Sequence, residues 1–174
     1  GDFVYMPFED DALIFKKRSA RSFSAEKALA LYRILEGGNV VVPAEALMRL
    51  YPEQGLFSRN IFTIKSDEEV SPLYLASALT AAGYRRTSLV ENAGDFSLRG
   101  DILDIFSPSE ELPVRIEFFG DTPERMRFFS PETHTSLREA DSITVIPVCD
   151  VFPEDAPSAV EKLKKYGKKV LVAY

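Results

Sequence analysis

The sequence of 174 residues contains a single cysteine, Cys149, and a single histidine, His134. One cysteine excludes an internal disulfide and is typical of a reducing compartment. One cysteine and one histidine also cannot form a standard zinc site. His134 stands in a polar stretch between Thr133 and Thr135, and nothing local suggests a base held by a carboxylate and facing a nucleophile, so we interpret it as a solvated loop residue and not as the base of a catalytic triad.

Long apolar runs are missing as well. No run approaches the roughly 20 residues of a membrane-spanning helix. The first residues, Gly1-Asp2-Phe3, carry an acid where a secretion signal carries bases. A hydrophobic content of 45% and a charged content of 28% are ordinary for a globular protein and exclude disorder. We therefore expect a cytoplasmic chain of about one to two domains with no membrane partner.

Positive charge is scarce overall and unevenly distributed. The net charge is −6, which argues against non-specific binding to nucleic acid. No lysine occurs between Lys65 and Lys162, and every base in that interval is an arginine. The seven are Arg85, Arg86, Arg99, Arg115, Arg125, Arg127 and Arg138. Arginine is enriched at protein interfaces, so either an interface or chance codon usage accounts for this stretch.

The two ends of the chain are predicted to alternate between helix and strand, as in an α/β domain. Residues 1–23 are expected to be a loop. The patterns then predict a helix over 24–36, a buried strand over 40–42, a helix over 44–50 and, near the C-terminus, a helix over 157–166 and a strand over 170–174. The α/β domain is incomplete, because each end of the chain is predicted to contain only part of a sheet.

The middle of the chain has a different pattern. A strand over 61–65 precedes a helix that begins after Ser71, with Pro72 in its first turn and Gly83 as its stop. An antiparallel meander follows over 84–129, with strands predicted over 84–90, 96–106, 114–119 and 125–129. Another strand is predicted over 143–148, after a polar stretch. The predicted fold class is therefore α/β with an α+β insert. Its parts are residues 1–58, an antiparallel module with a packed helix over 59–147, and the returning α/β domain over 148–174.

Recognisable catalytic motifs are absent. Gly94 and Gly100 have the wrong spacing for a phosphate-binding loop, and an acid follows them. Asp101, Asp104 and Glu117 could form a carboxylate cluster, but strand alternation would put the first two on opposite faces. We interpret these acids as partners of nearby arginines, and we expect no active site, metal or cofactor in this chain.

The segment Val114–Phe119 alternates between two faces. Val114, Ile116 and Phe118 form a core face, whereas Arg115, Glu117 and Phe119 point the other way. An aromatic residue beside an arginine on an exposed face is typical of a binding hot spot. The same combination recurs with Arg127 and Phe129 in the next strand. The alternative is that a helix covers Phe119 and that the arginines only pair with acids.

Two segments carry a family resemblance. Residues 94–106 (GDFSLRGDILDIF) and 112–121 (LPVRIEFFGD) resemble the signature GEFxxRGxxLDxFP…PxRxEFFGDEI, which bacterial transcription-repair coupling factors (Mfd) share with the excinuclease subunit UvrB. Residues 82–86 (AGYRR) resemble the GYxR motif of the same proteins. Residues 40–47 (VVVPAEAL) resemble the coupling factors more than UvrB. Thr122-Pro123 departs from the usual Glu-Ile.

The resemblance implies a non-catalytic fragment of a coupling factor that recruits UvrA to stalled RNA polymerase in nucleotide excision repair. The module would be inserted in a truncated, degenerate helicase-like domain. The implied UvrA contacts are Arg99, Arg115 and Phe119, with Glu117 and Arg127 in supporting positions. The ATP- and Mg-dependent DNA-translocating motor of the family, and its contacts with RNA polymerase and DNA, would lie outside this chain.

Two other functions stay open at this point. The chain could be a fragment of UvrB itself, the damage-recognition subunit. Less favoured is direct DNA binding by the arginines, because residues 84–130 carry more acids than bases. The oligomeric state is also open.

Overall fold

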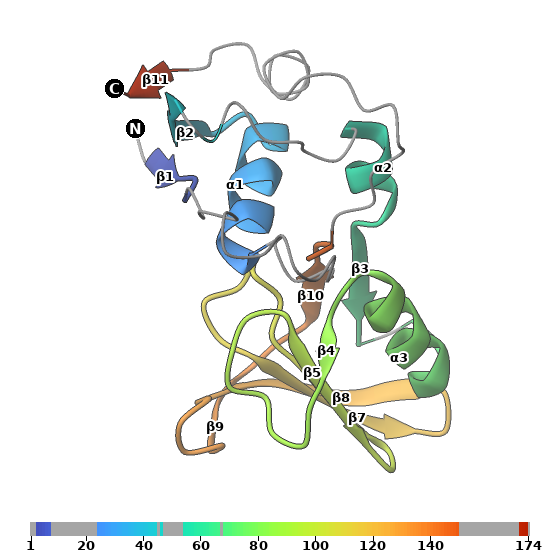
Figure 1. Cartoon of the computed structure of the whole chain (residues 1–174). Helices are drawn as coiled ribbons and strands as arrows, with labels where there is room; N and C mark the ends of the chain where they lie inside the picture. Colours follow the sequence, from blue (N-terminus) through green and yellow to red (C-terminus); the bar gives the residue numbers. More distant parts are fainter. Residues whose placement is uncertain are drawn as a thin grey trace, which may run out of the picture. The chain divides into compact units, whose positions relative to one another are not determined.

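A computed structural model describes residues 3–7, 24–44, 46, 54–66, 68–149 and 171–173 of the chain (Figure 1). The chain divides into two compact units. Unit 1 consists of Gly1–Asn60 and Cys149–Tyr174, and unit 2 is the continuous stretch Ile61–Val148. Unit 2 is thus inserted between two parts of unit 1, and the whole chain has a mixed α/β fold.

Unit 1 contains a parallel three-stranded sheet with β2 (Asn39–Pro43) between β1 (Phe3–Tyr5) and β11 (Leu171–Ala173). The predicted first helix is confirmed as α1 (Ala25–Leu35), whose N-cap Ser24 accepts a hydrogen bond from the backbone N–H of Lys27. A short helix, α2 (Gln54–Arg59), follows. The predicted strand over 40–42 is confirmed within β2.

Two predictions for unit 1 have other outcomes. The loop expected over 1–23 is wrong at β1, because Phe3–Tyr5 pairs with β2 across a sequence gap that local composition cannot indicate. The helix predicted over 157–166 lies outside the described residues, as does most of the one predicted over 44–50.

Unit 2 is built on a six-stranded sheet in the order β4-β5-β6-β7-β8-β9, which runs from green to orange in Figure 1. The strands are β4 (Arg85–Arg86), β5 (Asp95–Arg99), β6 (Ile102–Ile105), β7 (Val114–Phe119), β8 (Thr122–Phe129) and β9 (Ser136–Glu139). A separate antiparallel pair joins β3 (Phe62–Lys65) to β10 (Ser142–Val145). Helix α3 (Pro72–Ala81) lies against β5.

One face of the six-stranded sheet forms the core of unit 2. Cross-strand neighbours Leu103, Ile116 and Met126 are almost completely buried, and so are Leu75 and Leu79 of α3. Burying side chains of this size stabilises the fold by about 1.5–3 kcal/mol each. The alternation predicted for residues 114–119 is confirmed, because Val114, Ile116 and Phe118 are the buried members of β7.

The predicted meander needs three corrections. Residues 96–106 form two strands, β5 and β6, because the chain reverses at Gly100, whose φ of +59° favours glycine. The strand predicted over 84–90 shrinks to β4, which is parallel to β5, so the sheet is antiparallel only from β5 to β9. Finally, β9 was not predicted, because all four of its residues are exposed and polar composition hides it.

Among the described residues, no helix is long and apolar enough to cross a membrane.

Candidate functional site

The second face of the six-stranded sheet is polar, and we call it the polar face. Its residues follow from the cross-strand register. One row across the strands holds Ser97, Asp104, Arg115, Arg127 and Glu139, and the next row holds Arg99, Ile102, Glu117 and Arg125. Phe119 follows on β7, two positions beyond Glu117 and therefore on the same face.

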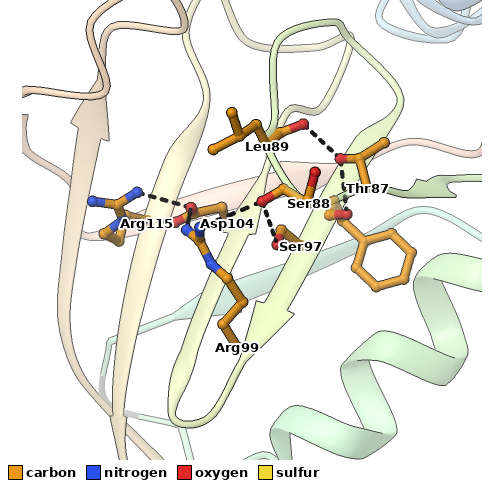
Figure 2. Close-up of polar contacts among 8 residues, drawn as sticks. Thr87, Ser88, Leu89, Ser97, Arg99, Asp104 and Arg115 are labelled. Carbon is orange, nitrogen blue, oxygen red and sulfur yellow. Dashed lines mark hydrogen bonds and ion pairs between the residues drawn. The ribbon is translucent and has the colours of Figure 1, made fainter.

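Asp104 lies at the centre of the polar face and is buried. Its two carboxylate oxygens accept hydrogen bonds from Arg115, at 2.7 Å from Nε and 2.8 Å from Nη2. One of these oxygens also accepts from Nη2 of Arg99 at 2.9 Å (Figure 2). A buried carboxylate is tolerated only when its charge and its lone pairs are both compensated. Here two guanidinium groups from neighbouring strands supply that compensation.

Arg115 is fixed from a second direction by an aromatic ring. Its guanidinium carbon lies 5.0 Å from the centre of the Phe129 ring, within the range of a cation–π contact. The hydrogen bonds that Arg115 donates to Asp104 raise the pKa of its guanidinium above its ordinary value, which already keeps an arginine charged. Only 20% of the Arg115 side chain is exposed. Arg115 therefore offers a positive charge in a nearly fixed position.

Arg99 has more freedom than Arg115. About half of its side chain, 49%, is exposed. Besides Asp104, it reaches the backbone carbonyl of Ser88, which accepts from Nη1 at 3.3 Å (Figure 2). Arg99 thus joins the sheet to the loop after β4, while about half of its side chain is left to solvent.

Arg127 and Glu117 form an ion pair on neighbouring strands, and Arg125 pairs with Glu139 at 2.6 Å. The Nε atom of Arg127 is buried and has no hydrogen-bond partner within the described part of the chain. The prediction that acids pair with arginines is confirmed for Asp104 and Glu117. The alternation argument for Asp101 is wrong, since this residue lies in the β5–β6 turn and not on a strand.

Phe119 is the most exposed large hydrophobic residue among those described, at 79%. It ends β7, directly before Gly120, whose φ of +62° favours the turn into β8. The alternative in which a helix covers Phe119 is wrong for the described residues. Phe119 lies four positions beyond Arg115, a distance of about 13 Å along β7.

The structure therefore places all five sequence-predicted site residues, Arg99, Arg115, Glu117, Phe119 and Arg127, on one face of one sheet. Of the residues that support this face, the sequence indicated Asp104 as a partner of arginines and Phe129 as an aromatic beside Arg127, but not the contacts of either with Arg115. Ser88 was missed, because it contributes only through its backbone carbonyl oxygen. The expected roles of the five residues stay a prediction.

His134 lies in the loop between β8 and β9 with a positive φ of 56°. Its ring is 5.8 Å from that of Phe129, so it is a half-buried loop residue that packs against an aromatic ring and is less solvated than expected. The described residues contain no group of three or more His, Cys, Asp or Glu side chains that could hold a metal ion.

Comparison with known families identifies unit 2. Residues 62–152 match the model of the UvrB interaction domain. The chain is 33% identical to the transcription-repair-coupling factor of Bacillus subtilis strain 168 over 126 residues, which is 71% of this chain. Over 81 residues, 47% of the chain, it is 43% identical to the Myxococcus xanthus protein of the same name.

A second group of relatives is named UvrABC system protein B, after the other kind of protein that shares the signature. The chain is 32% identical to UvrABC system protein B of Mycobacterium tuberculosis over 128 residues, 72% of this chain. The chain spans only a small part of these relatives: 11% of the Bacillus protein, 7% of the Myxococcus protein and 18% of the Mycobacterium protein.

Proposed function

Since the chain belongs to the UvrB interaction domain family, we propose that unit 2 is a non-catalytic protein-interaction module whose partner is UvrA. Its relatives named transcription-repair-coupling factor support a role in coupling transcription to nucleotide excision repair. The contact surface is the polar face, with Arg99, Arg115 and Phe119 as its main binding residues.

One observation carries this proposal: an exposed phenylalanine shares a sheet face with two arginines that a buried carboxylate holds in place. A phenylalanine that is 79% exposed gains free energy when a partner removes it from water. Arginine forks make directional, charge-assisted hydrogen bonds to carboxylates. A partner surface with an apolar pocket near acidic groups fits this arrangement. Glu117 and Arg127 neutralise each other between these binding residues.

The wider role is recruitment of UvrA to stalled RNA polymerase in the bacterial cytoplasm. In this role unit 1 is part of a degenerate helicase-like domain that carries unit 2. The ATP-driven motor and the contacts with RNA polymerase and DNA belong to other parts of the coupling factor. The resemblance of residues 40–47 to the coupling factors supports this assignment.

Isothermal titration of the chain with UvrA tests the proposal. We expect Arg115→Ala and Phe119→Ala each to weaken binding by at least about 1–2 kcal/mol, the range of hot-spot residues. Tyr74→Ala is the matched control, because Tyr74 is 68% exposed but lies on α3. Circular dichroism establishes that each variant is folded. Unchanged affinity in both folded variants would refute the proposal.

A fragment of UvrB is the second candidate, and the likeness to UvrABC system protein B favours it. Both candidates present the same face to UvrA, so the titration does not separate them. Binding of RNA polymerase by the full-length protein that contains this chain does separate them, because the proposed coupling role requires it.

Direct DNA binding fits the polar face poorly. Arg99 and Arg115 share Asp104, and Arg125 and Arg127 each have a glutamate partner. These four arginines and their three acidic partners leave a net charge of only +1, which is too little for the many phosphate contacts of non-specific DNA binding. We expect no salt-dependent shift of duplex DNA by the chain, and such a shift would revive this alternative.

A further inference from the structure

We infer that Asp104 is the positioning residue of the contact surface: its buried carboxylate sets the spacing and direction of Arg99 and Arg115 before a partner arrives. This inference rests on the proposed function, in which these two arginines contact UvrA. Asp104 itself touches solvent at only 1% of its surface, so it acts through the arginines and not by contact.

The geometry favours positioning over simple neutralisation. Asp104 is the cross-strand neighbour of Arg115 on β7 and lies diagonally opposite Arg99 on β5. Its two oxygens receive three guanidinium hydrogen bonds at 2.7, 2.8 and 2.9 Å. Two of them come from one fork, which fixes the plane of the Arg115 guanidinium as well as its distance. The Phe129 ring fixes the same group from another side.

The consequence for binding is a lower entropic cost. An arginine side chain normally loses rotamer freedom when a partner immobilises it. Arg115 loses most of that freedom when unit 2 folds, because Asp104 and Phe129 hold it. Arg99 loses part of it to Asp104 and to the Ser88 carbonyl. The contact surface is therefore partly ordered before UvrA binds.

Charge and positioning make opposite predictions for Asp104, which gives the inference a clear test. Removing this carboxylate adds one positive charge to the polar face. If the arginines act only through their charge on an acidic partner, Asp104→Asn should strengthen UvrA binding, because less of their charge is neutralised. If they act through their positions, Asp104→Asn should weaken it, because the amide has one acceptor oxygen and cannot accept all three guanidinium hydrogen bonds.

Asp95 offers a matched control on the same sheet. It is also buried, and it holds Arg85 through two hydrogen bonds of 2.9 and 3.1 Å. Its side-chain hydrogen bonds within the described part of the chain go to Arg85 and the Asn92 backbone and not to Arg99 or Arg115, and Arg85 is not among the proposed binding residues. Asp95→Asn therefore removes a buried carboxylate and an arginine ion pair from unit 2, and leaves the Asp104 cluster intact.

The experiment is a UvrA titration of the full chain at two salt concentrations, with wild type, Asp104→Asn, Asp95→Asn and Phe119→Ala. We expect Asp104→Asn to reduce affinity about tenfold, a loss typical of an interface hot spot. We expect Asp95→Asn to stay within about twofold of wild type. Tighter binding by folded Asp104→Asn, or an equal loss in both variants, would overturn the positioning role.

The Phe119→Ala variant distinguishes failure of the positioning role of Asp104 from failure of the proposed function. If Phe119→Ala weakens binding and Asp104→Asn does not, the positioning role is wrong and the proposed function stands. If neither Phe119→Ala nor Arg115→Ala weakens binding, the proposed function itself is wrong.

A second variant keeps the inference testable if Asp104→Asn does not fold. Arg115→Lys preserves the positive charge and leaves Asp104 in place. A single ammonium group, however, cannot bridge both carboxylate oxygens as the guanidinium fork does. We expect a loss of affinity of about tenfold, and unchanged affinity would show that charge alone is sufficient.

Discussion

Arg115 and Asp104 form a two-point ion pair across neighbouring strands, with both hydrogen bonds shorter than 3 Å and the carboxylate buried. The pair stands at the centre of the polar face, where Ser97 is buried and Glu117 and Arg127 are partly buried. It links the stability of unit 2 to the proposed binding surface, because the same carboxylate also holds Arg99.

Removing the buried partner should cost far more stability than removing an exposed one. We expect Asp104→Asn to lower the free energy of unfolding of unit 2 by about 3 kcal/mol, because it leaves two guanidinium groups without their counter-charge. Arg99→Ala should cost less than about 1 kcal/mol, because half of Arg99 is in solvent. Denaturant unfolding followed by circular dichroism measures both. A larger loss for Arg99→Ala would contradict the burial argument.

The neighbouring phenylalanines of β7 should respond in opposite ways. Phe118 is 6% exposed and Phe119 is 79% exposed. We expect Phe118→Ala to destabilise unit 2 by about 3–4 kcal/mol through loss of core packing. Phe119→Ala should change stability by less than about 0.5 kcal/mol. Thermal unfolding of the two variants provides the comparison, and similar losses would mean that Phe119 is part of the core.

Because Tyr84 is buried, we expect the free energy of unfolding of unit 2 to decrease at high pH. Its ring is buried, and its hydroxyl lies 2.9 Å from the carbonyl oxygen of Ile146 and 3.2 Å from Oγ of Ser107. Burial raises the pKa of Tyr84 above its ordinary value of 10.0. The folded state thus favours the neutral phenol, so this contribution is complete below pH 10 and decreases as pH rises through the folded-state pKa.

The slope attributable to Tyr84 should approach about 1.4 kcal/mol per pH unit above pH 10, where only the unfolded state loses this proton. Tyr84→Phe should remove that part of the decline, whereas Tyr74→Phe, at an exposed position, should retain it. Urea unfolding measured from about pH 8 to about pH 11, on both sides of the ordinary tyrosine pKa of about 10, tests this. Equal slopes in both variants would exclude Tyr84 as the source.

The turn at Gly100 should tolerate substitution only at a cost. A Cβ added at this position would meet open space, but the φ of Gly100 is +59°, which an L side chain adopts with strain. We expect Gly100→Ala to destabilise the β5–β6 hairpin by about 1–2 kcal/mol. Gly100→Asn should cost less, because asparagine tolerates this conformation better. Hydrogen exchange of the β5 and β6 amides reports the difference, and equal protection in both variants would contradict the backbone argument.

The local sequence pattern was sufficient to predict elements with a regular spacing of buried residues or with clear end signals. Alternation at Val114–Phe119 predicted which side of β7 is buried, and Pro72 and Gly83 marked the limits of α3. The hairpin between β5 and β6 was missed because the apolar residues on both sides of Gly100 read as one continuous strand. The fully exposed β9 was missed because only its pairing with β8 makes it a strand.

The candidate site was predictable in its residue types but not in its organisation. The motif residues Arg99, Arg115 and Phe119 are visible in the sequence, and alternation places the last two on one face. That Asp104 is buried between the two arginines depends on the register of three strands. Register depends on how the strands pair and on the geometry of the turns between them, and the local pattern of each strand does not reveal it.

Site-specific photocrosslinking measures most directly whether UvrA covers the polar face. The benzophenone-bearing analogue of phenylalanine is placed at position 119 in one variant and at position 74 in the other. Both natural residues are exposed aromatics, Phe119 on β7 and Tyr74 on α3. The proposed function predicts a covalent product with UvrA from position 119 and none from position 74. A product from position 74 with none from position 119 would contradict it.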